Sequence, residues 1–168
     1  MTRLLILVLI AFLAISIYGA GRASRVFSGT PLRRICGATL FIASIFVALT
    51  AIGGGITLAI GMDKFPAAWL IGTLFSSYLI PGLILAVVVG GSAAIAAVAT
   101  LCRSDAGTLA SMLAGAILLG WLIGERLILP KEAFVPQFWW LEAIYIAAGL
   151  LMLVPGLTVR WTDRRRRS

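Results

Sequence analysis

The sequence predicts an all-α membrane protein, a bundle of five transmembrane helices, and three observations support this prediction. Hydrophobic residues make up 61% of the chain and charged residues only 12%, against roughly 25% charged in soluble domains. Five apolar stretches have the length of about 20 residues that a spanning helix needs. The charged residues fall almost entirely between or beyond these stretches. We therefore expect a single transmembrane domain over residues 1–160, with four core spans and an additional amino-terminal span.

The first two predicted spans cover about residues 4–20 and 35–60. At about 1.5 Å per residue the first just crosses the hydrocarbon. Its small final residues, Gly19 to Gly21, also resemble a signal-peptide cleavage site. Cleavage before Arg22 would export a loop with four arginines, so we expect the span to be retained. The second span is longer than necessary and contains three consecutive glycines, Gly53 to Gly55, which favour tilting or loosening.

The remaining spans are expected at about residues 78–101, 107–129 and 139–159. A segment that begins at Pro66 and is rich in aromatic residues precedes the third span. We expect a short interfacial or partly re-entrant helix there, at about 65–76. Ser77 would cap the third span, and Pro81 would then lie in its first turn, where the missing N–H costs nothing. A basic cytoplasmic tail over 161–168 would follow the last span.

Basic residues concentrate on one predicted face of the membrane. That face has ten basic and two acidic residues, in the loop 22–34, at 103–105 and at 160–167, whereas the other face has four of each. Because positive residues favour the cytoplasmic side, we expect the amino terminus outside and the carboxyl terminus inside. In a bacterium this orientation refers to the inner (plasma) membrane. Topology thus explains the net charge of +8, and we expect no nucleic-acid partner.

Small residues recur at four-residue spacing on spans two, three and four, and such rows let helix backbones approach closely in a membrane. We expect the rows to pack these three spans against one another. The alternative is a face for a homodimer or for another membrane protein. The glycines of the rows are Gly55, Gly90, Gly120 and Gly124.

A mixed polar cluster is expected at the outer face, because ionisable groups near apolar depth are costly and usually have a reason. We expect these groups to reach the interface and to pair with one another, Arg126 with Glu142 for instance. Alternatively, they bind a small ligand, a lipid headgroup or a partner's loop. The candidate residues are Asp63, Lys64, Tyr78, Glu125, Arg126 and Glu142.

The chain offers little for catalysis. Histidine is absent, and Cys36 and Cys102 stand too far apart for a CxxC motif, so we expect two free thiols, no metal site and no bound cofactor. No nucleophile–base pair or phosphate-binding loop is recognisable, and we expect no enzymatic activity. The centres of the first three spans hold no ionisable residue, which disfavours a proton-coupled carrier.

The tail is suited to anionic lipid, at about 1 kcal/mol for each basic residue near the surface. The expected lipid-binding residues are Arg164, Arg165, Arg166 and Arg167.

The stretch from Gly53 to Gly91 contains a proline-started segment followed by FSSYLIPGL, residues 75–83, and a glycine-rich helix. In these features the chain resembles a group of small, uncharacterised bacterial multi-pass inner-membrane proteins, over spans two to five. Many members of that group have an acid where Ser77 stands and lack the first span. The resemblance implies a compact helical bundle, and it implies no particular activity.

Two functions remain open from the sequence. The first is a non-enzymatic accessory or structural subunit of a membrane assembly, or a homo-oligomer, in contact with membrane lipids. It is favoured by the small-residue faces and the lack of catalytic groups. The second is a small oligomeric transport protein or pore, with the outer polar cluster as its mouth.

Overall fold

The described part of the chain consists of helices joined by short turns and contains no strand. The computed structural model describes the backbone of residues 2–61, 75, 77–128 and 139–167. Within these ranges it describes the side chains of residues 10–161, except that of Ser104. In chain order the elements are α1 (Thr2–Val26), α2 (Pro31–Ala59), α3 (Leu79–Leu83), the π-helix η2 (Ile84–Gly90), α4 (Gly91–Cys102), α5 (Ser104–Ile128) and α6 (Trp139–Arg167).

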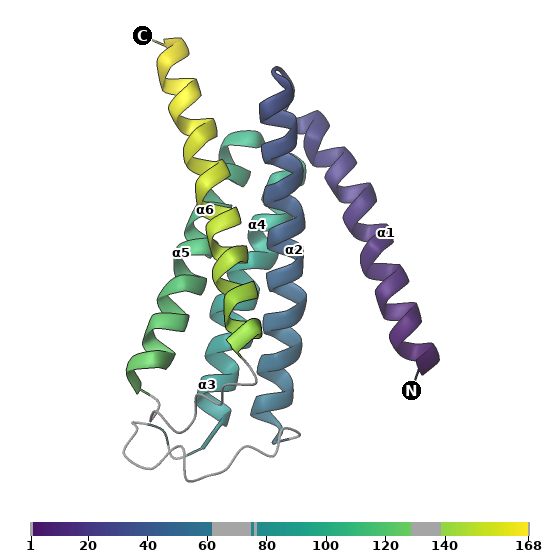
Figure 1. The fold of residues 1–168 in the computed structure, drawn as a ribbon, viewed down its shortest axis with the longest axis vertical. Helices are drawn as coiled ribbons and strands as arrows, with labels where there is room; N and C mark the ends of the chain where they lie inside the picture. Colours follow the sequence, from purple (N-terminus) through teal and green to yellow (C-terminus); the bar gives the residue numbers. More distant parts are fainter. Residues whose placement is uncertain (1, 62–74, 76, 129–138, 168) are drawn as a thin grey trace.

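Four helical stretches are long and apolar enough to cross a membrane: Pro31–Ala59, Leu79–Cys102, Asp105–Ile128 and Trp139–Trp161. The second of these is formed by α3, η2 and α4, which follow one another without a break. The four helices run up and down through the molecule (Figure 1). This arrangement is consistent with the predicted all-α, multi-pass membrane protein.

The helix bounds differ from the predicted spans at two informative places. The second span begins earlier than expected, at Pro31, because Thr30 caps it by accepting a hydrogen bond from the backbone N–H of Arg33 at 3.5 Å. The last helix continues to Arg167, so the segment predicted as a basic tail extends α6 as helix. The expected interfacial helix at 65–76 lies outside the described residues, apart from Phe75.

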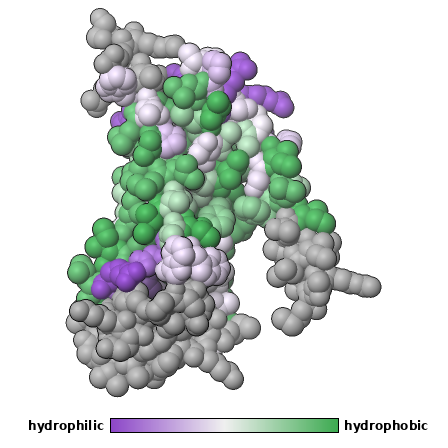
Figure 2. Space-filling view, viewed as in Figure 1, coloured by the Kyte–Doolittle hydropathy of each residue, from purple (hydrophilic) through white to green (hydrophobic). Residues whose placement is uncertain are grey.

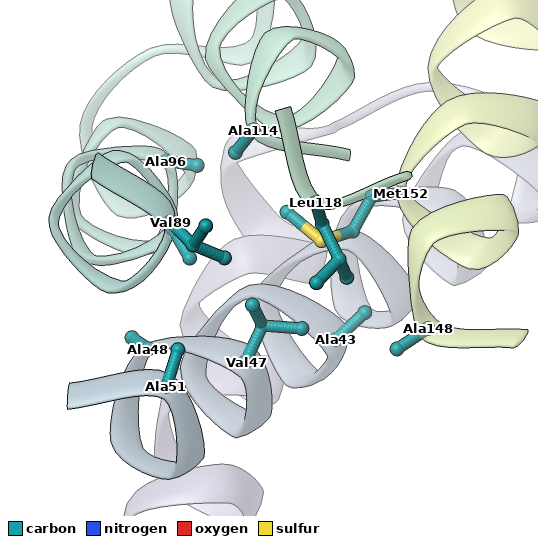
Figure 3. Packing of buried hydrophobic residues seen from close by; sticks show 11 residues of the cluster. Ala43, Val47, Ala48, Ala51, Val89, Ala96, Ala114, Leu118, Ala148 and Met152 are labelled. Carbon is teal, nitrogen blue, oxygen red and sulfur yellow. The ribbon is translucent and has the colours of Figure 1, made fainter. Parts of the chain in front are cut away.

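Helix α2 is the centre of the bundle, because it packs against every other helical element. Its buried face joins residues of η2, α4, α5 and α6 in the main core. Val47 of α2 lies beside Leu118 of α5 and Met152 of α6, each at most 1% exposed (Figure 3). The core is otherwise rich in alanine, and these small side chains let four helices share one compact centre.

Backbone contact between α2 and the third span is very close. A Cβ added at Gly55 would lie 2.5 Å from the carbonyl oxygen of Gly82 and 2.6 Å from the amide nitrogen of Ala86. Conversely, a Cβ at Gly82 would lie 2.6 Å from the Gly55 oxygen. The contact extends into the π-helical turns of η2, which contain Ala86, and Gly90 at their end lies against Ile52 of α2. Any side chain at Gly55 or Gly82 would force the two helices apart.

Helix α1 packs on one side of the bundle, against α2 and α4, and diverges from α2 towards its amino-terminal end (Figure 1). Near the α1–α2 turn, Gly19 lies against the ring of Phe41, and Gly37 lies against the ring of Phe27. Ala23 joins Phe41 and Ala97 in a small separate core cluster. The contact of α1 is therefore concentrated in its second half.

The close contact predicts a sharp difference between two neighbouring glycines of α2. Gly55→Ala should lower the free energy of unfolding by about 1–3 kcal/mol, the usual cost of overpacking a filled site. Gly53→Ala should leave it unchanged or slightly higher, because nothing lies within 4 Å of an added Cβ there. Unfolding of each purified variant by SDS in mixed micelles, followed by circular dichroism, measures both. Equal stability of the two variants would contradict the close contact.

Candidate functional site

Charged side chains gather at the two ends of the bundle, and Figure 2 shows hydrophilic residues near both ends with hydrophobic residues between them. One end, called here the arginine end, contains the α1–α2 turn, the α4–α5 turn and the carboxyl-terminal part of α6 (Figure 1). Its described basic residues are Arg22, Arg25, Arg33, Arg34, Arg103 and Arg160. The opposite end, called the glutamate end, contains the end of α5 and the starts of α3 and α6.

At the glutamate end, Arg126 and Glu142 form a two-point ion pair that joins the last turn of α5 to the first turn of α6. The Nε of Arg126 donates to Oε1 of Glu142 at 2.7 Å, and its Nη2 donates to Oε2. The side chains are 48% and 26% exposed, respectively. Each charge also lies at the helix terminus that favours its sign. The expected pairing of these two residues is confirmed.

Glu125 precedes this pair but faces a different direction. It follows the buried Leu118 by seven residues, two helical turns, and so lies on the core-facing side of α5. No described residue makes a hydrogen bond or ion pair with its carboxylate, which the charge of Glu142 repels and that of Arg126 attracts. Because Arg126 is bound at two points by Glu142, the Glu125 carboxylate has no hydrogen bond or ion pair to another described residue at this end.

The other predicted members of the cluster are less fully placed. Tyr78 precedes the first residue of α3 and is partly buried, and this burial raises the pKa of its phenol above the ordinary value. Asp63 and Lys64 lie outside the described residues. The structure therefore brings three of the six predicted residues into one electrostatic group, Glu125, Arg126 and Glu142.

A buried hydroxyl cluster that was not predicted consists of Ser44, Thr100 and Ser111, each with no exposed surface. The Oγ of Ser111 on α5 lies 3.5 Å from the Oγ of Ser44 on α2 and 3.5 Å from the Oγ1 of Thr100 on α4. Thr100 also donates to the carbonyl of Ala96 at 2.7 Å. These hydroxyls connect three helices, in a setting where interhelical hydrogen bonds add to packing.

A signal for this cluster exists in the sequence. Ser44 lies at core spacing between Leu40 and Val47, and Ser111 lies seven residues before Leu118. A hydroxyl on a helix face that is otherwise buried and apolar needs a partner, either its own helix or a neighbour. Hydroxyls inside spans most often bond to a carbonyl of their own helix. Thr50, Thr57 and Ser92 do so, whereas Ser44 and Ser111 lie close to a hydroxyl of a neighbouring helix.

The two cysteines are free thiols with different environments. Cys36 is buried, with its Sγ 3.7 Å from the Oγ1 of Thr158 on α6, whereas Cys102 is exposed. Within the described residues, no group of three or more histidine, cysteine, aspartate or glutamate residues could hold a metal ion.

The predicted glycine rows separate into two kinds. Gly55 and Gly90 pack against neighbouring helices, as expected. Gly120 and Gly124 do not, because no described atom lies within 4 Å of a Cβ added at either position. The reason is the rotation of α5: its contact with α6 uses a different glycine, Gly115, which lies against Gly149 and Met152. The expected internal packing of Gly120 and Gly124 is thus not found.

Comparison with protein-family models, with curated proteins and with solved structures finds no match to this chain.

The two glutamates should respond differently to neutralisation. Glu142→Gln should lower the free energy of unfolding, because it breaks the two-point ion pair with Arg126. Glu125→Gln should cost nothing, because the carboxylate has no hydrogen-bonded partner among the described residues. Chemical unfolding of the two variants in the same micelles gives the comparison. An equal loss in both would mean that Glu125 has a structural role.

Proposed function

We propose that this chain is a non-enzymatic integral membrane protein that acts as an accessory or structural subunit of a membrane assembly. The observation that carries the proposal is the open glycine pair of α5, Gly120 and Gly124. Gly55 and Gly115, by contrast, already pack against neighbouring helices inside the bundle. Other helical glycines such as Gly53 and Gly91 are open too, but Gly120 and Gly124 have the four-residue spacing of a GxxxG pair. A GxxxG pair left open on a lipid-facing helix has the geometry of a helix-docking surface.

The surroundings of the pair support this proposal. Gly120 is exposed, and one turn on either side lie the exposed Ala116 and Ile123. No described charged side chain occurs between Ala106 and Gly124 of α5. A partner helix could therefore approach the α5 backbone within the apolar zone, with neither charge nor bulk at the glycines to keep it away.

In this proposal the protein has five spans, and α1 is the fifth. Its large apolar side chains Leu13, Ile17 and Tyr18 are 57–75% exposed, as expected for a helix that faces lipid on most sides. The arginine end lies in the cytoplasm and the glutamate end outside, in a bacterial inner (plasma) membrane, since positive residues favour the cytoplasmic side. The segment 65–76 then lies at the outer interface.

The test is the size of the native complex. A tagged full-length chain, extracted from its own membrane with a mild detergent, should migrate on native gels as a stoichiometric complex with another membrane protein. Gly120→Ile combined with Gly124→Ile should release the chain as a smaller species, because the added side chains keep a partner helix at a distance. The isolated variant should be as stable as the parent, since nothing described lies within 4 Å of the added Cβ atoms.

Gly53→Ile is the matched control, because it adds the same side chain at an open glycine of α2 and should leave the complex intact. A homo-oligomer with a water-filled axis would support a pore instead. A monomer from native membrane, even after cross-linking, would exclude the assembly.

A further inference from the structure

The third span contains a rare element near its centre. The residues Ile84–Gly90 form the π-helix η2, with α3 on the side of the glutamate end and α4 on the side of the arginine end. The N–H of Gly91 reaches the carbonyl of Ala86, five residues back, so the turn is wider than that of an α-helix. Such turns are rare and are found frequently at functional sites. A stretch of this kind needs a contact that favours it over regular α-helix.

The contact with α2 provides that preference. Three small residues of the third span, at four-residue spacing, lie against α2: Gly82 and Ala86 pack on Gly55, and Gly90 packs on Ile52. In an α-helix, residues four apart drift by about 40° around the helix axis, so Gly82 and Gly90 would lie about 80° apart. The wider turns of η2 reduce this drift. They therefore keep all three small residues on the face that meets α2.

The two ends of the third span are held very differently. In α4, Thr100 packs closely on Gly107 of α5, and Ala97 shares a buried cluster with residues of α1 and α2. Helix α3, by contrast, packs mainly against α2. Its apolar side chains Leu79, Ile80 and Leu83 are 48–50% exposed. Helix α4 is thus fixed on three sides, whereas α3 depends on its contact with α2.

We propose that η2 is a hinge that lets α3 swing away from α2 while α4 stays in place. When the contact between Gly55 and Gly82 opens, the packing that favours the π-helical turns is lost, and the stretch returns to regular α-helix. Because the two kinds of helix differ in residues per turn, this change rotates α3 and turns Gly82 off α2. The glutamate end then has a closed state, the one described above, and an open state. This hinge is independent of the assembly proposed through α5.

The experiment measures the distance between α2 and the third span at each end of the contact, by electron paramagnetic resonance of paired spin labels in lipid nanodiscs. The labels are attached to a full-length chain whose two native cysteines are changed to serine, and they replace exposed residues. Ile60→Cys with Ile80→Cys reports on the glutamate end, and Ile35→Cys with Val98→Cys reports on the arginine end. The first pair should give two distances and the second pair one. A distribution as narrow at the glutamate end as at the arginine end would overturn the proposal.

Gly55→Ala should favour the open state, because the added Cβ fits only when α3 has left α2. The ratio of open to closed state should rise about 5- to 150-fold, the factor that corresponds to an overpacking cost of about 1–3 kcal/mol. Gly53→Ala is the matched control and should leave the ratio unchanged, since nothing lies within 4 Å of its added Cβ. The same ratio in both variants would contradict the hinge.

Deletion of Val87, which is 66% exposed, tests the π-helical turns themselves. The deletion shortens the spacing from Gly82 to Gly90 to about two α-helical turns, so a regular α-helix keeps both glycines on α2. The label pair at the glutamate end should then give the closed distance alone. Two distances in the deletion variant would overturn the hinge. If this variant fails to fold, the comparison of Gly55→Ala with Gly53→Ala decides.

Discussion

The low polarity of a bilayer interior is the constraint on which the other features of this structure depend. A charge at the centre of a spanning helix costs at least about 2.5 kcal/mol, and each described charged side chain lies near a helix end. This separation creates an arginine end and a glutamate end, and it leaves the helices between them to associate without charge. Three charges approach apolar depth at the glutamate end, and two of them, Arg126 and Glu142, bind each other.

Helices that are apolar on all sides gain little from the hydrophobic effect when they associate in lipid, so close backbone packing has to hold them together. Helix α2 achieves this by meeting the third span at Gly55 and Gly82. The buried hydroxyls of Ser44 and Ser111 add directional contacts between α2 and α5. Packing of this kind uses Gly55, Gly82 and Gly115 inside the bundle, whereas the GxxxG pair of α5 has no described atom within 4 Å of an added Cβ.

Four of the five predicted spans and the ion pair could be predicted because they follow from local rules. The length of apolar runs locates the spans, and the positions of Arg126 and Glu142 near facing helix ends predict their pairing. The rotation of each helix about its own axis cannot be predicted in this way. In the sequence, Gly120 and Gly124 lie in the same kind of small-residue row as Gly55 and as Gly90. In the structure, α5 nevertheless contacts α6 through Gly115. The π-helical turns of η2 and the buried cluster around Val159 also depend on tertiary contacts that the sequence pattern does not contain.

The orientation of the chain in the membrane decides which end of the bundle faces the cytoplasm and which end a partner outside could reach. Cys102 provides a direct test, because it is exposed at the arginine end whereas Cys36 is buried. A membrane-impermeant maleimide should label the chain in inside-out vesicles and leave it unlabelled in right-side-out vesicles, and Cys102→Ser should abolish the labelling. Labelling of Cys102 in right-side-out vesicles would contradict the proposed topology.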